Sequence, residues 1–192
     1  MDNIFFDLKK LKYLGKNVII GKCVRIRHPE RVIIDDYAII DDFTYISTKL
    51  SVGKFVHIGS NSVIQGGQGE CSFADFSGCS PGCKIITCSD DYISGLACPQ
   101  IPQRFKGNMV IGKVILKKHA LLGTGTVVLP NVTIEEGAAT GAMTLVNKSL
   151  DEWKLYAGVP ARFAKSRDKE KILQLEAEFL EEYTLNNCTI KT

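Results

Sequence analysis

An aliphatic residue recurs at every sixth position along much of the chain. Between residues 112 and 148 the series runs through Leu116, Leu122, Val128 and Ile134. An α-helix needs apolar residues every three or four positions, and a β-strand needs them at every second position, so a period of six fits neither over a long run. The chain must therefore turn at regular intervals, and each hexad is long enough for one short strand and a corner.

The same period extends through most of the sequence. Its aliphatic positions are Ile20, Ile26, Ile34, Ile40, Ile46, Val52, Ile58 and Ile64, then Phe73, Cys79 and Ile85, then Val110, Leu116, Leu122, Val128, Ile134 and Val146, with Thr140 as the polar member. Two positions before them stand small or compact residues such as Ala38, Thr44, Val56, Ser62, Cys71, Ser77, Cys83, Val114, Ala120, Thr126, Val132, Ala138 and Thr144. Short repeats of fixed period indicate a solenoid. We predict an all-β parallel β-helix, with three hexads in each triangular coil and the aliphatic side chains inside.

Glycine follows several of the aliphatic positions, at Gly21, Gly53, Gly59, Gly123 and Gly141. We expect Gly and Asn to supply the positive φ that tight corners need. The chain has seven cysteines, an odd number, and none are in C-x-x-C spacing. This pattern predicts reduced thiols, with Cys71, Cys79 and Cys83 filling the core.

Three segments interrupt the period and divide the chain. They are HPER (28–31), GGQG (66–69) and a long excursion over 88–109. We expect a cap over 1–16, in which Ile4, Leu8 and Leu11 share a helical face, and the β-helix over 17–148. Residues 149–192 form a C-terminal extension that ends in an amphipathic helix of about 17 residues, which begins after Ser166 and Asp168 and packs on the β-helix or on a neighbouring subunit.

Charge and hydropathy exclude several classes of function. The net charge of +3 suits a protein whose ligands carry phosphate, but it is too weak to argue for nucleic acid or an anionic membrane as partner. No apolar run reaches the roughly 18 residues of a membrane span. The N-terminal segment lacks the small-residue cleavage site of a secretory signal, so we expect a cytoplasmic protein.

Several motifs together resemble one enzyme family. A hexapeptide β-helix is followed by YAGVPAR (156–162) and a helix, and the excursion holds SDDY (89–92). This combination resembles the hexapeptide-repeat acyltransferases, and within them the sugar acetyltransferases of the galactoside, maltose and lipopolysaccharide O-acetyltransferase type. VHIG (56–59), SDDYISG, KVILKKH and LVNK are most similar to the branch from O-antigen and capsule gene clusters.

The resemblance implies a fold, a reaction and a quaternary structure. It implies a left-handed β-helix and a homotrimer that binds acetyl-CoA in the groove between two subunits. The acceptor would be a hydroxyl or an amine of a sugar, either a small molecule, nucleotide-linked or lipid-linked, and it would enter near the projecting loop.

The CoA-binding positions also follow from the resemblance. Thr124 in LLGTGT and Ala142 in TGAMTLVNK are 18 positions apart, so they should stack on one edge and offer backbone groups to the pantetheine arm. The resemblance places Asn147, Lys148, Arg162 and Lys165 near the phosphates of CoA, where cationic side chains suit phosphate oxygens. Without it, Thr124 and Ala142 would be only small corner residues.

Attack by a sugar hydroxyl on a thioester needs a base, and histidine suits this role near neutral pH. The galactoside-type enzymes have this histidine in the loop, where the present chain has Ser89, Asp90 and Asp91. His57 in VHIG is the strongest substitute, whereas His119 and His28 are weaker candidates.

Asp90 and Asp91 are predicted to orient the acceptor or to hold the histidine tautomer. The hexad count puts His57 and Asp90 at different corners of the triangle. The site is therefore predicted to be assembled from two chains.

Three alternatives remain open at this point. A trimeric binding or scaffold protein without catalysis would explain the missing loop histidine. A zinc enzyme of the carbonic anhydrase type would need three converging histidines, which the spacing of His28, His57 and His119 disfavours, so no metal is predicted. A covalent acyl-enzyme on Cys88 or Cys98 has no histidine close in sequence to support it.

Overall fold

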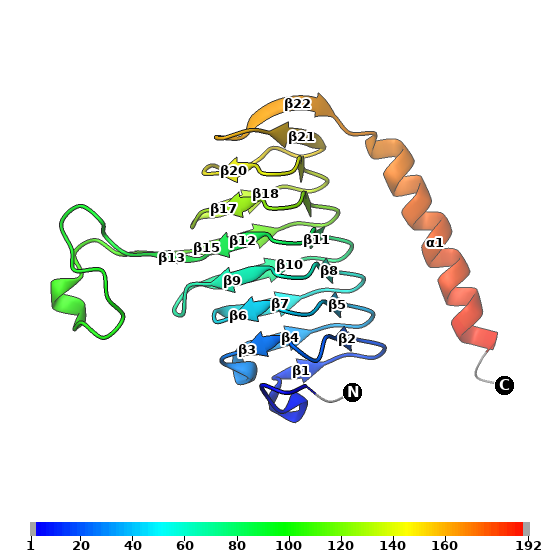
Figure 1. Ribbon diagram of the computed structural model, residues 1–192. Helices are drawn as coiled ribbons and strands as arrows, with labels where there is room; N and C mark the ends of the chain where they lie inside the picture. Colours follow the sequence, from blue (N-terminus) through cyan, green and yellow to red (C-terminus); the bar gives the residue numbers. More distant parts are fainter. Residues whose placement is uncertain (1–2, 190–192) are drawn as a thin grey trace.

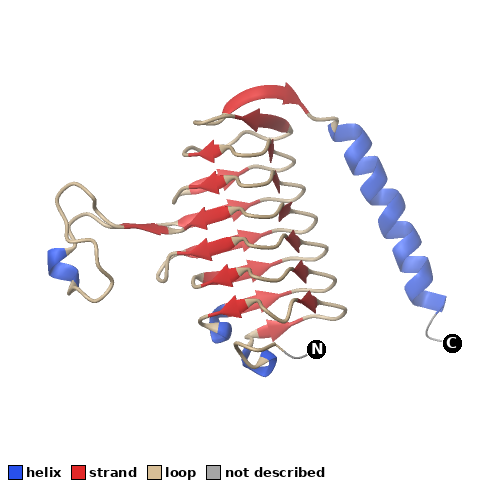
Figure 2. Cartoon of the chain, in the orientation of Figure 1, coloured by secondary structure: helices blue, strands red, loops and turns tan. Residues whose placement is uncertain are grey.

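A computed structural model describes residues 3–189 of the chain, which fold as a parallel β-helix. Short strands stack coil upon coil into three parallel sheets, and a loop and a helix project from the stack (Figures 1 and 2). The β-helix predicted from the hexads is confirmed.

The three sheets, named A, B and C here, meet at three corners. Sheet A contains β1 (Tyr13–Leu14), β4 (Val32–Ile34), β7 (Lys49–Val52), β10 (Glu70–Phe73), β15 (Lys113–Leu116) and β18 (Val132–Ile134). Sheet B contains β2 (Ile19–Ile20), β5 (Ile39–Ile40), β8 (His57–Ile58), β11 (Gly78–Cys79), β16 (Leu121–Leu122), β19 (Ala139–Thr140), β21 (Lys154–Ala157) and the antiparallel β22 (Arg162–Ser166). Sheet C contains β3 (Arg25–Ile26), β6 (Tyr45–Ile46), β9 (Val63–Gln65), β12 (Lys84–Ile86), β17 (Val127–Val128) and β20 (Leu145–Val146).

The inward positions of the hexads form one continuous core. Ile34, Ile40 and Ile46 on three successive faces are fully buried, and the small residues two positions earlier are buried beside them. Cys71, Cys79 and Cys83 lie in this core as predicted. Val110 does not: it is 42% exposed and belongs to the antiparallel stem of the loop, so its place in the hexad series was wrong.

The corners obtain their left-handed residues partly as predicted. Positive φ occurs at Gly125 and at asparagines such as Asn61, but also at corner residues with rings, which the sequence did not predict: Tyr37, Phe55, Phe76, His119 and Trp153. The glycines that follow the aliphatic positions have other roles. A Cβ at Gly59 would lie 2.6 Å from the backbone nitrogen of Pro81, so glycine is needed there for close approach between coils.

The corner between sheets A and B carries a column of rings. Phe55 stacks between Tyr37 and Phe76 with centroids 5.2 and 5.0 Å away, and Phe76 stacks on His119 at 5.4 Å. Each ring occupies the left-handed corner residue of its coil. Offset stacking of this kind adds to the burial of the rings.

The helix α1 (Lys169–Thr189) runs down this column (Figure 1). Asp168 caps it by accepting a hydrogen bond from the Lys171 amide, as the sequence predicts. Phe179 packs edge-on against Phe55. Glu176 accepts hydrogen bonds from His119, at 2.9 Å, and Lys118, at 2.5 Å, and its side chain is 9% exposed. The helix therefore packs on the β-helix of its own chain.

The ends of the solenoid differ from the predicted boundaries. From residue 3 to residue 12 the one helical element is the 3₁₀ turn η1 (Leu8–Lys10), and β1 already pairs with β4, so coiling begins before residue 17. At the other end β21 still stacks on β19, beyond residue 148, and β22 then folds back along it.

All three interruptions of the hexad period fall at the corner between sheets C and A. The first contains η2 (Pro29–Arg31), and the second is the turn 66–69. The third leaves through β13 (Cys88–Ser89), holds η3 (Gln103–Phe105) and returns through β14 (Val110–Ile111). Within the part that the structure describes, no helix is long and apolar enough to cross a membrane.

Replacing Glu176 with Gln should lower the free energy of unfolding at pH 7 by about 1–2 kcal/mol, because the buried carboxylate loses its charge-assisted hydrogen bonds. Burial raises the pKa of Glu176, but Lys118 and His119 outweigh burial and hold it below 4.5. A lowered acid pKa stabilises the fold above the unfolded value, and this contribution is lost as pH falls through the folded pKa. The difference from wild type should therefore shrink below pH 4.5.

Denaturation followed by the fluorescence of Trp153, the single tryptophan, would measure this effect. Glu178→Gln on the same helix is the control. Equal stability of the Glu176 variant and wild type at pH 7 would contradict the proposed docking of α1.

Candidate active site

The corner between sheets B and C stacks the predicted pantetheine positions directly. The Met143 amide donates to the carbonyl of Thr124 at 2.8 Å, and the Gly125 amide donates to Pro81 at 3.0 Å. Thr124 and Ala142 are both exposed. Within residues 3–189 their own amide N–H groups donate to no acceptor. This corner therefore presents a column of small residues with available backbone donors.

The predicted phosphate ligands lie at the end of this stack but not at one point. All four are exposed. Arg162 begins β22 opposite Ala157, next to the corner between sheets B and C. Asn147 and Lys148 follow β20 and reach the corner between sheets C and A, and Lys165 lies opposite Leu155, toward the third corner. Of these residues, only Arg162 joins Thr124 and Ala142 at one corner.

His57 lies on the outer face of sheet B beside a groove of about 460 Å³. Its side chain is 57% exposed, and its Nε2 is 2.7 Å from Oδ2 of Asp41. An ionised carboxylate can only accept, so Nε2–H donates to Asp41 and Nδ1 is left as the basic nitrogen. The pair has the geometry of a general base held in one tautomer.

The groove beside His57 is lined by residues in register with it, the first of which is a glycine. Gly78 follows His57 in the next coil, and Leu121 follows Gly78. A Cβ at Gly78 would lie 2.7 Å from the His57 carbonyl oxygen, so the position stays hollow. Ser80 lines the groove toward the Thr124 column. The groove therefore extends from His57 to Gly123, which directly precedes Thr124 of the predicted pantetheine column.

Asp41 was not predicted from the sequence, although the hexad pattern contains a signal for it. Ile39 pairs with His57 one coil away, and Asp41 follows two positions later on the same outward side. Counting one coil back from the histidine and two positions forward would have found it.

Asp90 and Asp91 lie away from His57, at the root of the projecting loop. Asp91 is occupied within the loop: its two oxygens accept from the Ser94 hydroxyl and from the amides of Ile93, Ser94 and Asn108. These hydrogen bonds, the Ser94 hydroxyl first, hold the pKa of Asp91 well below its usual range. This pattern favours a structural role in the loop for Asp91. No hydrogen bond or ion pair engages the carboxylate of Asp90 within the described residues.

The two other histidines have different surroundings. His119 is 7% exposed and lies between Phe76 and Trp153, with Nε2 on Glu176, so it anchors α1. His28 precedes η2 and has Nδ1 3.4 Å from Glu30. It lines the groove that also contains Asp90, a placement that the sequence analysis did not foresee.

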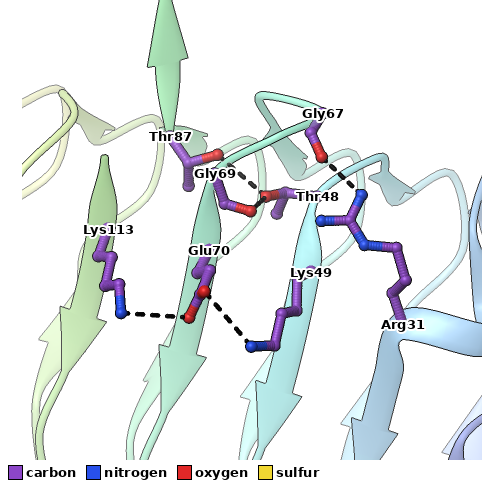
Figure 3. A network of polar contacts seen from close by, with 8 residues as sticks. All are labelled: Arg31, Thr48, Lys49, Gly67, Gly69, Glu70, Thr87 and Lys113. Atoms are coloured by element: carbon purple, nitrogen blue, oxygen red, sulfur yellow. Dashed lines mark hydrogen bonds and ion pairs between the residues drawn. The ribbon is translucent and has the colours of Figure 1, made fainter. Parts of the chain in front are cut away.

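The groove at the loop root, of about 420 Å³, has a wall built from the second interruption, and Figure 3 shows how this wall is held. Arg31 donates to the carbonyl of Gly67 at 2.7 Å, and the buried hydroxyl of Thr48 donates to Gly69 at 2.5 Å. Thr48 also meets the Thr87 hydroxyl at 3.0 Å, just before the loop departs. The three interruptions thus form one connected structure.

Glu70 continues this network across sheet A. It lies 3.3 Å from Lys49 and 3.6 Å from Lys113 (Figure 3). The hydrogen bond from Lys49 holds the pKa of Glu70 below its ordinary value. The two strands that flank β10 are thereby linked at the base of the groove wall.

The surroundings of the cysteines and of the possible metal ligands do not favour a covalent acyl-enzyme or a metal site. Burial and the nearby Asp90 raise the pKa of Cys88, which disfavours a thiolate nucleophile there. No group of three His, Cys, Asp or Glu side chains gathers to hold a metal among residues 3–189.

Comparison with known proteins decides the family. A dTDP-4-amino-4,6-dideoxy-D-glucose acyltransferase of Escherichia coli is 30% identical over 187 residues, which cover 93% of this chain and 94% of that protein. The chain belongs to the hexapeptide-repeat sugar acyltransferases. No family profile matches the chain.

Solved structures agree with this assignment. AntD, an N-acyltransferase from Bacillus cereus in complex with dTDP and 3-hydroxybutyryl-CoA, superposes with a TM-score of 0.88 at 38% identity, over 95% of this chain and 99% of AntD. A hexapeptide-repeat acetyltransferase of Vibrio cholerae, at 16% identity and a TM-score of 0.59 over 84% of this chain and 77% of its own, shares the fold.

These relationships settle several predictions. The left-handed β-helix, an acyl-CoA-dependent sugar acyltransferase activity and CoA as the acyl carrier are confirmed. These relationships do not support the alternative of a binding or scaffold protein without catalysis. WcaF of Escherichia coli, named for colanic acid biosynthesis, is 29% identical over 154 residues, 80% of this chain and 69% of its own, in line with the predicted similarity to polysaccharide enzymes.

His57→Ala should reduce turnover by about 100-fold or more, because a general base contributes roughly that factor. Asp41→Asn should cost less and shift the pH profile of kcat, since Asp41 acts through the ring of His57. Steady-state rates measured between pH 5 and 9 would show both effects, with Asp42→Asn as the neighbouring control. Near-normal turnover of the His57 variant would refute its role as base.

Thr48→Val should loosen the turn 66–69, because the Gly69 carbonyl loses its buried donor at a cost of about 1–3 kcal/mol locally. Hydrogen exchange of the Gly69 amide, which donates to Gly66 at 2.7 Å, should speed up by about 10-fold, while exchange in sheet B stays constant. Thr133→Val on the outer face of sheet A is the control. Unchanged exchange at Gly69 would show that Thr48 does not hold the turn.

Proposed function

We propose that this enzyme transfers a short acyl group, acetyl in the first instance, from acyl-CoA to the amine of a nucleotide-linked amino sugar. The relationship to the amino-sugar acyltransferase of Escherichia coli, over nearly the whole of both chains, carries this proposal. The structure adds the unengaged carboxylate of Asp90, which suits a protonated amine better than a hydroxyl.

AntD offers a second line of support. Its variants crystallised with CoA replace one serine and one aspartate ten positions later. In this chain Ser80 and Asp90 have the same spacing. Ser80 lines the groove of His57, and Asp90 lines the groove at the loop root.

The reaction is a single displacement. Asp90 holds the amino group of the acceptor, which first loses one proton to water and becomes a neutral amine. The amine nitrogen attacks the thioester carbonyl while His57 takes a second proton from it through Nδ1, and the carbon–sulfur bond breaks. The sulfur leaves as the thiolate of CoA and takes up the proton from the imidazolium, which restores the base.

The active site needs two copies of the chain. In one chain, sheet C separates the groove of His57 from the root of the loop that carries Asp90. The loop reaches away from its own body with Tyr92, Ile93 and Leu96 at 80%, 98% and 56% exposure. An apolar projection of this kind is suited to contact a neighbour. A homotrimer in which each loop meets the next copy would bring Asp90 to His57.

Mixed trimers test the proposal. His57→Ala and Asp90→Asn should each be nearly inactive alone, but coexpression should restore about one quarter of wild-type activity, because random mixing unites an intact His57 and an intact Asp90 at that fraction of the interfaces. The assay follows release of the CoA thiol with a dTDP-linked 4-amino sugar as acceptor.

A double variant that carries both changes in one chain, mixed with wild type, controls for dilution. No recovery in the coexpressed pair would place the complete site within a single chain. No thiol release by wild type with any nucleotide-linked amino sugar would overturn the proposed substrate.

A further inference from the structure

The groove at the loop root contains a buried cation. Lys106 is 9% exposed, and its ammonium donates only to the carbonyl of Pro99, at 3.3 Å. Among the described residues no carboxylate lies within ion-pair distance of it. An ammonium has three donors, and burying it with one neutral partner is costly. The side chain is thus positioned to bind an anion.

A second cation faces the same groove. Arg27 lies just past the end of β3, and within residues 3–189 its guanidinium makes no ion pair. The guanidinium is a planar fork that binds phosphate through two parallel hydrogen bonds. Tyr45, half-buried on sheet C, lines the groove between the interruptions and offers a ring face.

The negative charge in this groove is Asp90. Its carboxylate lies near enough to Cys88 to raise the pKa of that thiol, and Lys106 acts on the same thiol in the opposite direction. The groove therefore holds two cations and one carboxylate that have no ion-pair partners of their own. A ligand with a diphosphate and a protonated amine has the complementary charges.

We propose that Arg27 and Lys106 form a diphosphate-binding site for the acceptor, with Asp90 receiving its amine. This inference rests on the proposed function for the amine, but the diphosphate site is testable without any turnover. The shared chemistry is a diphosphate monoester, which either a nucleotide sugar or a lipid-linked sugar would supply.

Calorimetric titration of the full-length enzyme with dTDP, thymidine and geranyl diphosphate separates these sources. Wild type should bind dTDP at least about 10-fold more tightly than thymidine, and Lys106→Met and Arg27→Gln should each weaken dTDP binding by about 10-fold or more. Binding of dTDP but not of geranyl diphosphate identifies the nucleotide as the carrier, and the reverse result identifies a lipid carrier.

Controls keep the result independent of folding and of catalysis. Arg25→Gln removes the same charge two positions earlier, in β3, but the Arg25 guanidinium lies over Phe5, outside the groove, and this change should leave dTDP binding unchanged. Affinity for CoA should be constant in all variants. If Lys106→Met fails to fold, the Arg27→Gln variant tests the diphosphate site by itself, because Arg27 is exposed and its replacement should not affect folding. Wild-type affinity for the bound diphosphate in the Arg27 variant, or binding of neither dTDP nor geranyl diphosphate by wild type, would overturn the diphosphate site, while acyl transfer by wild type would still support the proposed function.

Discussion

The register between coils is the constraint on which the rest of this molecule depends. Each inward aliphatic residue stacks on its equivalent in the next coil, as Ile40 does on Ile58, and the parallel ladder fixes that stacking. Slipping by one residue would turn every inward side chain outward. Because the register is fixed, residues that occupy equivalent corners form columns. Each column presents a continuous surface for packing or binding.

The three corners have separate uses. The corner between sheets A and B carries the ring column from Tyr37 to His119 and holds α1. The corner between sheets B and C carries small residues with available backbone donors. The corner between sheets C and A carries the interruptions, which join into one groove. In the function proposed above, two of these corners contain the chemistry, and a neighbouring copy would bring them together because they lie on opposite edges of sheet C.

Much of the fold could be read from the sequence because burial alternates with a strict period. The inward hexad positions and the cap at Asp168 follow from local pattern. The ring column did not, since a positive φ at Phe55 or Trp153 is unfavourable locally and is held by ring contacts and backbone hydrogen bonds to the neighbouring coil. Val110 was misplaced because its aliphatic side chain kept the period by coincidence within the loop stem.

The candidate site could be predicted from the sequence only in part, because some of its residues are defined by contacts between distant segments. His57 stood out by residue type, and its partner Asp41 could be found by counting along the hexads, but the burial of His119 depends on contacts with α1. Lys106 carried no sequence signal, because a lysine in a loop is usually exposed and only the fold of the loop buries it. Residues that act through a column or a loop fold need the three-dimensional register to be recognised.

The central claim is that acyl donor and sugar acceptor meet between two copies of this chain. A crystal structure with CoA and dTDP bound tests it most directly. The predicted result is CoA along Thr124 and Ala142 of one protomer, with its thiol near His57 of that protomer and near Asp90 of its partner. CoA and dTDP bound together at one corner of a single protomer, with no residue of a second copy in contact, would contradict it.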